Sequence, residues 1–393
     1  MRPILVSSCT GCHAEGGIAP FALTTYDEVA EVADRVAAAT RDRLMPPFFA
    51  DNSGACNTWE NYRGLTDLEI DVIQEWVDGG RPLGDPTTPA PEPPTLDRLQ
   101  DPDLVLEMPD TYAIDGSVND DYRCFVVETG LEEDMFATGY EVTPGNAQRV
   151  HHVIVYTPAS DEAGDAARRL DATEGEVGDG YTCYGGPRVD APPLVLWAPG
   201  AGATTFPEGT GVSVAAGRPQ IIQIHYNNQV EGSPDTDRTS VALTLSDSAS
   251  QAYILPIANL DIELPPRMTS VTQTATLDVG AIVPIPIDLR IWGAFPHMHT
   301  LGRSMNVTIH RAPPPGEDGD AVDDCLIDMP RWDFDWQLAY WLDDPMTFST
   351  RDAVSITCSY NTISRDEVVT WGEGTLDEMC LNFVYVTIPL FGG

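Results

Sequence analysis

The spacing of hydrophobic residues changes from a helical period to a strand period along the chain. Within residues 1–84, apolar positions recur every three or four residues behind polar starts, which predicts helices. Thr25-Tyr26-Asp27-Glu28 has the form of a capping box, in which two side chains bond the free amides of the first helical turn. Three valines follow it on one face of the predicted helix: Val29, Val32 and Val36.

A second capping box, Thr66-Asp67-Leu68-Glu69, opens another predicted helix. Ile70, Ile73 and Val77 would face inward from this helix. Gly79-Gly80 ends it, because glycine readily adopts the left-handed backbone that follows a helix. Residues 1–84 are therefore expected to form a small all-α domain.

From about residue 101 the apolar residues alternate with polar ones in short runs, bounded by Gly, Pro, Asn and Asp. This pattern predicts β-strands, and the clearest runs are 150–156, 219–226, 240–245, 291–295, 305–309 and 380–388. A stretch of this length exceeds one sandwich, so we expect two antiparallel, jelly-roll-like β-sandwiches over residues 101–247 and 248–393. Five prolines within residues 85–94 predict a stiff linker, 85–100, before them.

Charge excludes some classes of partner. The 393 residues include 61 acidic and 21 basic side chains, no lysine, and a net charge of −40. Such a chain is unsuited to nucleic acid or anionic membranes, although its acidic surface would also suit a basic partner or simply solvation. No run of 18 apolar residues occurs, so no transmembrane helix is expected.

Cys9-Thr10-Gly11-Cys12-His13 has the CxxCH spacing at which two thiols bond a haem and the histidine binds its iron. Met45, in Leu44-Met45-Pro46-Pro47-Phe48, is the expected second iron ligand. The alternatives are a surface dithiol and a core methionine. Residues 1–84 resemble a small class I cytochrome c, which implies a covalent haem c. That in turn implies export to the periplasm or the extracellular space, with a signal peptide removed.

Six further cysteines are scattered along the chain: Cys56, Cys124, Cys183, Cys325, Cys358 and Cys380. They form no second CxxC pair. In an oxidising compartment, six such cysteines predict three disulfides.

The histidines after His13 fall into few motifs. His297 and His299 are two apart on a predicted strand, so both project to one face and can chelate one metal ion. His151 and His152 would point to opposite faces of a regular strand, and can share an ion only if the strand bends or ends there. His310 alternates away from its apolar neighbours and is expected to face solvent.

Four ordered motifs carry a resemblance: His151-His152-Val-Ile-Val-Tyr, Gln223-Ile-His225-Tyr, His297-Met-His299-Thr-Leu-Gly and Asp377-Glu378-Met379-Cys380. Together they resemble the copper type II, ascorbate-dependent monooxygenases over residues 101–393. The resemblance implies two copper ions: an electron-storing copper on His151, His152 and His225, and a catalytic copper on His297, His299 and Met379. Imidazole suits both copper oxidation states, and a thioether favours Cu(I).

The same resemblance implies two disulfides, Cys358–Cys380 and Cys124–Cys183. Cys56 and Cys325 are then left over. Their pairing would join the predicted haem domain to the second sandwich, and two unpaired thiols are the alternative.

The resemblance implies a monooxygenase that hydroxylates an aliphatic C–H with O2, using electrons from an external donor. A fused haem would pass those electrons to the His151/His152/His225 copper. Phe295 and Phe383 stand where peptide-hydroxylating members place an arginine and a tyrosine, which disfavours a peptide substrate. Both phenylalanines suggest a small substrate that is apolar near the reacting carbon, unless they are core residues. The other classes are a non-enzymatic haem/copper electron-transfer or storage protein and a peroxide-releasing oxidase.

Overall fold

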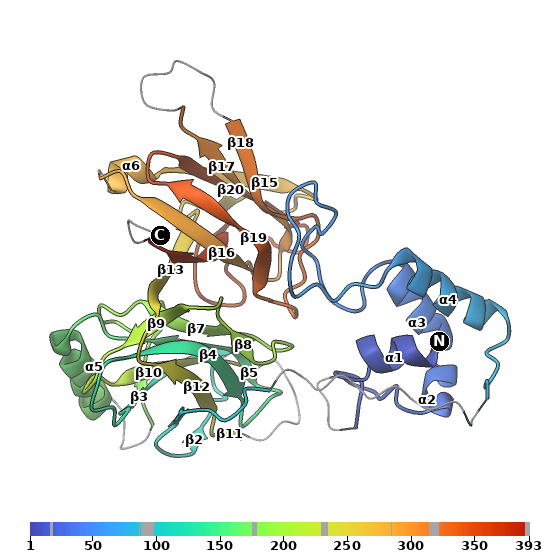
Figure 1. The fold of residues 1–393 in the computed structure, drawn as a ribbon, viewed down its shortest axis with the longest axis horizontal. Helices are drawn as coiled ribbons and strands as arrows, with labels where there is room; N and C mark the ends of the chain where they lie inside the picture. The colour runs from blue at the N-terminus through green and yellow to red at the C-terminus, as the bar shows by residue number, and fades with distance from the viewer. Residues whose placement is uncertain are drawn as a thin grey trace. The chain divides into compact units, whose positions relative to one another are not determined.

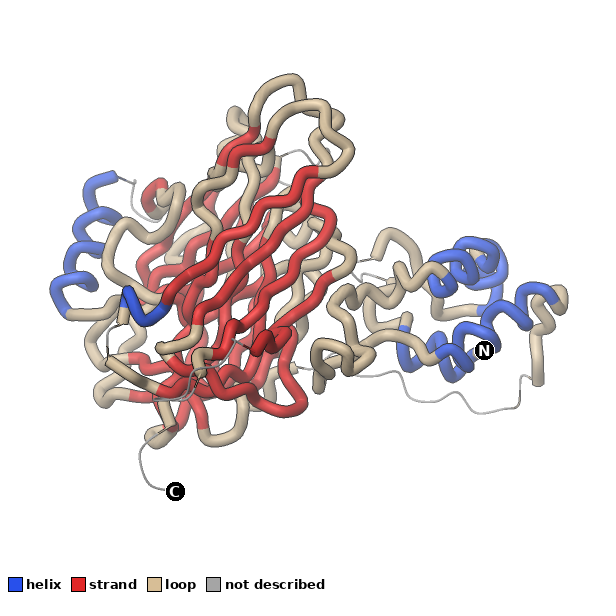
Figure 2. The backbone as a smooth tube through the Cα atoms, turned by 90° about the horizontal axis from the view of Figure 1, so that it is seen from above, coloured by secondary structure: helices blue, strands red, loops and turns tan. Residues whose placement is uncertain are grey.

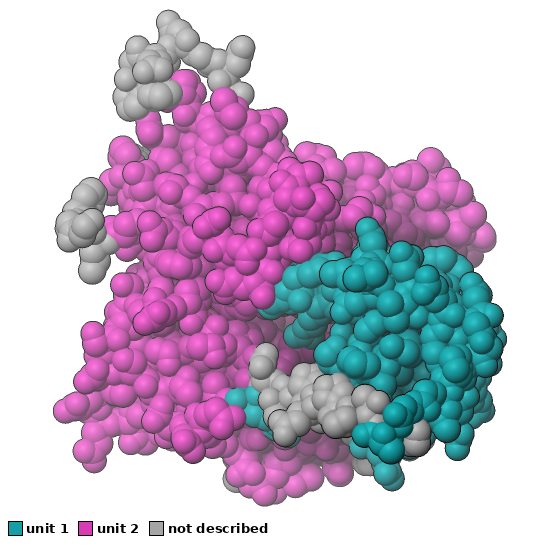
Figure 3. Space-filling view, turned by 45° about the vertical axis from the view of Figure 1, so that its right-hand side comes forward, with its two compact units in different colours: residues 1–48, 61–98 teal, residues 49–60, 99–393 magenta. Residues whose placement is uncertain are grey.

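The computed structural model describes residues 1–15, 19–85, 87, 98–174, 179–228, 235–283, 285–313 and 322–389. The chain divides into two compact units, which Figure 3 colours separately. The first comprises residues 1–48 and 61–98, and the second comprises residues 49–60 and 99–393. Most of the expected linker, 85–100, lies outside the described residues.

The described residues of the first unit form four helices: α1 (Arg2–Ser8), α2 (Tyr26–Glu31), α3 (Ala33–Arg41) and α4 (Asp67–Asp78). Both expected capping boxes form, with Thr25 and Thr66 each accepting a backbone amide. Caps of this kind contribute about 0.5–2 kcal/mol each. The run expected as one helix from residue 26 is two helices, because Val32 leaves helical geometry at φ −109° and ψ 12°.

A single apolar core holds these helices together. Its buried members are Ile4, Leu5, Leu23, Val29, Val32, Val36, Ala37, Leu65, Ile70 and Ile73. Burying each of the larger side chains contributes about 1.5–3 kcal/mol. Val77, expected to face inward, is only partly buried and packs at the edge of this core.

The second unit is dominated by strands, as Figures 1 and 2 show. Its first half contains β1 (Leu104–Glu107), β2 (Tyr112–Ala113), β3 (Asp120–Val127), β4 (Met135–Thr143), β5 (Val150–Tyr156), β6 (Tyr181–Thr182), β7 (Pro193–Trp197), β8 (Thr204–Thr205), β9 (Thr210–Val214), β10 (Gln220–Asn227), β11 (Thr236–Asp237) and β12 (Ser240–Ser246). Its second half contains β13 (Ser250–Ala258), β14 (Glu263–Leu264), β15 (Val271–Asp278), β16 (Asp288–His297), β17 (Gly302–Arg311), β18 (Val322–Met329), β19 (Tyr340–Ser349), β20 (Ala353–Tyr360), β21 (Val369–Thr370) and β22 (Leu381–Thr387).

One nine-stranded sheet runs through both halves of this unit. Its order is β1-β12-β4-β9-β13-β22-β16-β19, with β8 paired to β4. The halves join where β13 pairs in parallel with β9, Ser250 opposite Thr210 and Gln251 opposite Gly211. The expected sandwiches therefore share a sheet across the boundary placed near residue 247.

Two smaller sheets complete the layers. A five-stranded sheet, β6-β3-β10-β5-β7, shares a buried core with the first half of the large sheet. A four-stranded sheet, β15-β20-β17-β18, belongs to the second half. In β20 the alternate residues Val354, Ile356, Cys358 and Tyr360 are buried, as period-two patterning requires. The prediction of antiparallel β-sheets after residue 101 is thus confirmed for the named strand pairs other than β9–β13, which is parallel.

The purely β expectation was wrong at two places, α5 (Asp161–Glu174) and α6 (Val279–Ile282). Helix α5 contacts β3 and β6, and it lies beside β3 in Figure 1. Its buried residues are Ala163, Gly164 and Ala167, which are too small to give the strong apolar period of a typical helix. Asp161 and Glu162 in its first turn stabilise the helix, because their negative charges lie at the positive end of the helix dipole.

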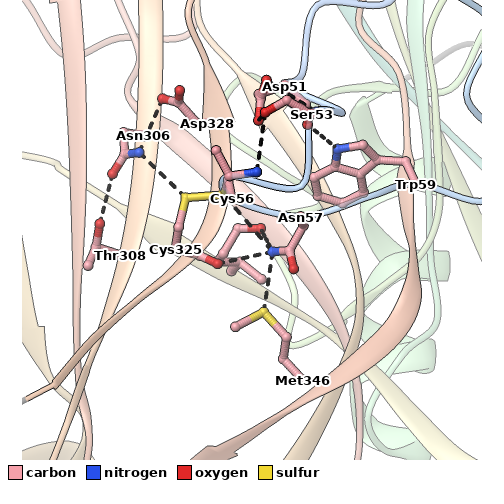
Figure 4. The surroundings of a disulfide bond; sticks show 12 residues. Asp51, Ser53, Cys56, Asn57, Trp59, Asn306, Thr308, Cys325, Asp328 and Met346 are labelled. Atoms are coloured by element: carbon pink, nitrogen blue, oxygen red, sulfur yellow. Dashed lines mark hydrogen bonds between the residues drawn. A yellow bond between two sulfur atoms is a disulfide. The ribbon is translucent and has the colours of Figure 1, made fainter.

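Residues 49–60 leave the helical part of the sequence and pack in the second unit (Figure 4). Cys56 forms a disulfide with Cys325 on β18, and the Asn57 amide donates to the carbonyls of Cys325 and Leu326. Trp59 is 2% exposed, bridges to Leu342 of β19 and donates its indole N–H to Asp51 O. This segment therefore packs against strands β18 and β19 of the second half.

Three disulfides form: Cys56–Cys325, Cys124–Cys183 and Cys358–Cys380. These are the pairs that the sequence led us to expect. Cys9 and Cys12 are free thiols. Among the described residues, no helix has both the length and the apolar character needed to span a membrane.

Candidate metal centres

Three histidines converge on neighbouring strands of the five-stranded sheet: His151 and His152 on β5, and His225 on β10. The strand register explains how adjacent histidines reach one place. His225 pairs with His152, but Tyr226 pairs with Val150, so His151 is an extra residue in the ladder. Such a β-bulge re-aims a side chain. The bend that the sequence left open is therefore present.

The spacing of the imidazole nitrogens suits a metal ion. The Nδ1 atom of His152 lies 3.4 Å from that of His151 and 3.4 Å from that of His225. At the roughly 2.0–2.1 Å distance usual for metal–histidine bonds, three coplanar nitrogens lie about 3.5 Å apart. All three possible ligand atoms lie within 4.8 Å of one another. Burial lowers the pKa of each ring, so the histidines stay neutral, which is the metal-binding form.

Asp120 and Tyr122 of β3 hold the His225 ring. The Nε2 atom of His225 donates to Asp120 Oδ1 at 2.9 Å, and the Tyr122 ring stacks on the imidazole at 4.2 Å and 8°. Burial opposes ionisation of Asp120, but hydrogen bonds from His225 and Thr375 outweigh it and lower its pKa. With the proton on Nε2, the Nδ1 lone pair of His225 faces the other two histidines.

The second cluster lies where β16 ends and β22 begins. His297 is the last residue of β16, and it pairs with Leu381 of β22, two residues after Met379. The rings of His297 and His299 have centroids 5.2 Å apart. Met379 is 4% exposed and lines the same cavity as His297.

Both histidines of this cluster donate Nδ1–H to a neutral acceptor. His297 bonds Gln337 Oε1 at 2.6 Å, and the amide is oriented because its Nε2 donates to Phe334 O. His299 bonds Asp377 O at 3.1 Å. Each Nε2 is left as the ligand atom. Burial lowers the pKa of His297 to about 4 and that of His299 to about 3.

Glu378 fixes the backbone around this second cluster. Its fully buried carboxylate accepts the amides of His299 at 3.0 Å, Leu301 at 2.6 Å and Met379 at 3.3 Å. Burial raises the pKa of Glu378 to about 7, although these amides act in the opposite direction. One side chain thus positions a histidine and the methionine together.

The two clusters face one another within the second unit. The rings of His152 and His297 have centroids 6.1 Å apart. Phe334 stacks on His151 at 4.3 Å and meets His299 edge-on at 6.1 Å. The sequence did not reveal that Phe334 contacts both clusters, nor that Asp120 and Gln337 bond the histidines. The partners of these three residues are remote along the chain.

A cavity of about 510 Å³ opens beside both clusters. His152, His297 and Met379 line it, together with Phe295 and Phe383. The two phenylalanines, which the sequence left as either pocket or core residues, therefore border a cavity. Among the described residues lining it, Glu373 is the one carboxylate, and arginine is absent.

The CxxCH segment lies in the first unit. His13 donates Nδ1–H to Phe21 O at 3.0 Å, and burial together with Cys12 raises the pKa of Cys9 to about 11. Met45 lines a small cavity with Phe48 and Tyr62, and His13 does not line that cavity. On the other unit, His310 bonds Asp323 and Ser355, away from both histidine clusters.

Both halves of the second unit match the sequence profiles of one protein family. The sequence profile described as "Copper type II ascorbate-dependent monooxygenase, N-terminal domain" matches residues 107–233, and that of the C-terminal domain matches residues 252–387. This chain belongs to the copper type II ascorbate-dependent monooxygenase family. Both histidine clusters of this monooxygenase-family chain fall within the matched ranges.

Three curated relatives illustrate the similarity. Dopamine beta-hydroxylase of Rattus norvegicus is 25% identical over 287 residues, covering 67% of this chain and 43% of that protein. Putative DBH-like monooxygenase protein 2 of Homo sapiens is 26% identical, covering 61% and 47%. Tyramine beta-hydroxylase of Caenorhabditis briggsae is 24% identical, covering 62% and 40%. The chain spans less than half the length of these relatives. Among solved structures, the major capsid protein P2 from Bacteriophage PM2 has a TM-score of 0.30 at 11% identity, covering 74% of this chain and 98% of its own.

Proposed function

We propose that this protein is a copper-dependent monooxygenase that hydroxylates an aliphatic C–H of a small molecule with O2. His151, His152 and His225 would hold one copper ion, and His297, His299 and Met379 would hold another. When bound, the two ions supply the redox chemistry: electron storage at the first cluster and oxygen activation at the second. The observation that carries the proposal is that two differently composed clusters border one cavity.

The chain's own residues prepare this site before any metal binds. Asp120 and Gln337 fix the tautomers of His225 and His297, so each presents a lone pair rather than a proton. Glu378 holds the backbone of His299 and Met379. The apolar lining, which includes Trp197, Leu338 and Phe295, excludes water from the reacting carbon.

We infer that the substrate is an amine that is apolar at the reacting carbon. Glu373 is the only lining carboxylate among the described residues, and burial together with Asp377 raises its pKa. A protonated amine beside Glu373 would offset that burial by stabilising the charged carboxylate. Dopamine and tyramine, which appear in the names of two relatives, are amines of this kind. A carboxylate-bearing substrate would find no lining arginine among the described residues.

The test uses 2-phenylethylamine under labelled O2 with the copper-loaded protein and ascorbate. We expect a product heavier by one labelled oxygen atom. Glu373→Gln is expected to raise KM for this amine while leaving KM for neutral ethylbenzene unchanged, because only the amine uses the carboxylate. Equal KM changes for both molecules would contradict the amine assignment, and absence of labelled product from every amine and arene tried would contradict the hydroxylase.

We further propose that residues 1–84 bind a covalent c-type haem and pass electrons from an external donor toward the copper sites. Cys9 and Cys12 are free for thioether bonds, and His13 Nδ1 donates to Phe21 O, which leaves Nε2 to bind iron. Met45 is the proposed second ligand. The haem would supply one-electron transfer. The three disulfides also support export to an oxidising compartment, the periplasm or the outside of the cell.

Co-expression with a cytochrome c maturation system tests the haem directly. We expect a denatured protein whose mass includes one haem and whose absorption spectrum is that of a c-type haem, with both features lost in Cys9→Ser/Cys12→Ser. A wild-type chain that carries no haem under these conditions would identify the motif as a plain dithiol. Unchanged turnover of the double variant with the physiological donor would remove the electron-feeding role.

A further inference from the structure

A hydrogen-bonded series connects the two histidine clusters through residues 373–379, which we call the bridging loop. We propose that Asp120 and Thr375 are positioning residues that couple the His225 ring to this loop, and through it to the second cluster. The inference rests on the proposed copper sites. It concerns how the chain orients its ligands rather than which reaction follows.

The series begins at the first cluster. Asp120 is on β3, where it pairs with Asn227 of β10, two residues after His225. Its side chain is 11% exposed, against 2% for that of His225. Its Oδ1 accepts from His225 Nε2 at 2.9 Å. Because the opposite nitrogen of this ring faces His152, any shift of the Asp120 carboxylate rotates or displaces the proposed ligand atom.

Thr375 reaches the same carboxylate from the second half of the unit. Its amide donates to Asp120 Oδ2 at 3.2 Å, and its hydroxyl donates to Oδ1 at 2.5 Å. Thr375 is 3% exposed, so water does not compete for these bonds. Asp120 therefore accepts two bonds from the bridging loop and one from His225.

A second contact fixes the start of the loop. The Tyr122 hydroxyl donates to Glu373 O at 2.8 Å, while its ring stacks on His225. Both residues that hold His225, one at its edge and one on its face, thus also hold the bridging loop. A loop fixed twice to β3 cannot move without disturbing His225.

The far end of the loop holds the second cluster. Asp377 O accepts His299 Nδ1–H at 3.1 Å, and Asp377 N donates to Gly374 O at 2.8 Å, which closes the loop on itself. Met379, the proposed thioether ligand, follows two residues later. The order His225, Asp120, Thr375, Asp377, His299 is therefore continuous through hydrogen bonds and a short stretch of backbone.

Copper(II) titration of the full-length metal-free protein, followed by electron paramagnetic resonance, tests this coupling. Asp120→Asn is expected to weaken copper binding at the first cluster about 10–100-fold, the usual effect of losing an outer partner of a ligating histidine. Thr375→Val is expected to weaken binding and change the copper hyperfine splitting, whereas Thr375→Ser, which keeps the hydroxyl, restores both. Thr272→Val removes an exposed hydroxyl that bonds Ser359, and should change neither.

The reach to the second cluster is measured in a His225→Ala background, where the first cluster is disabled. Thr375→Val is expected to weaken the remaining copper site in this background, because the bridging loop has lost its anchor on β3. An effect confined to the first cluster, or a lower melting temperature with unchanged affinity and spectrum, would overturn the coupling. Copper binding that responds as described in a protein that hydroxylates nothing would instead remove only the proposed function.

Discussion

The two histidine clusters differ in what holds their ligands. At the first, three Nδ1 atoms face one another, and His225 is backed by a carboxylate, Asp120. At the second, Nδ1 of both histidines is tied to a neutral oxygen, on Gln337 and Asp377, which leaves Nε2 for the metal. A carboxylate partner raises the basicity of an imidazole, and a thioether favours Cu(I). Under the proposed copper assignment, the outer partners as well as the ligands would give the two ions different tasks.

Removing a ligand from either cluster should have the largest effect. We expect His225→Ala and Met379→Ile each to lower hydroxylation more than about 100-fold, the upper end of losses seen for outer partners alone. The two variants should differ in copper content, because His225→Ala removes an imidazole, which binds both copper oxidation states, whereas Met379→Ile removes a thioether, which favours Cu(I). Product formation and bound copper per chain measure this. A Met379→Ile protein with wild-type turnover would contradict the assignment of Met379 as a ligand of the second cluster.

Removing the neutral partner of His297 should have a smaller effect, limited to one cluster. Gln337→Leu takes away the acceptor that fixes the His297 tautomer, so copper affinity of the second cluster is expected to fall about 10–100-fold. The first cluster should keep its affinity. Gln273→Leu is a matched control, since Gln273 is a half-buried residue of β15 whose side-chain amide donates to Glu263 O. Equal weakening of both clusters by Gln337→Leu would contradict their separate support.

Acidification should lower the stability of the metal-free protein gradually. The unfolded chain takes up protons on histidine from about pH 6.5 downward, whereas burial keeps His297 neutral to about pH 4 and His299 to about pH 3. The free energy of unfolding should therefore fall as pH falls from 6.5 to 4, by about 1.4 kcal/mol per unit for each of these histidines. Glu378, whose pKa is raised to about 7, acts in the opposite direction and offsets about one histidine. The first cluster acts in the same direction. Urea unfolding at pH 7, 6 and 5 measures the slope, and a flat profile would mean that the clusters are not buried.

Local patterns predicted the individual elements well. The run 150–156 is strand β5 as expected, and both capping boxes form. The bulge at His151 was not predictable, because it is defined by the register against β10, some 70 residues away. Helix α5 was missed because alanines make its buried face. The shared sheet depends on the parallel contact of β9 with β13, which no local pattern encodes.

The sequence indicated the candidate ligands, but not the residues that support them. Spacing marked His297 and His299 as a chelating pair, and the family resemblance supplied His151, His152, His225 and Met379. Asp120 lies 105 residues from His225, and Gln337 lies 40 residues from His297, so no spacing marks either as a partner. Glu378 was present in a quoted motif, yet its bonds to three amides depend on the turn after β16. Outer partners are chosen by tertiary packing, and that is why they needed the structure.

The central claim, that two copper sites border one cavity in order to oxygenate a substrate, is tested most directly by following labelled oxygen. The reduced, copper-loaded protein is given 2-phenylethylamine and limiting labelled O2, and product and peroxide are quantified together. The account predicts one labelled oxygen atom in the product for each O2 consumed, with little peroxide. Oxygen consumption recovered entirely as peroxide would identify an oxidase, and no consumption would identify an electron carrier, and either result would contradict the account.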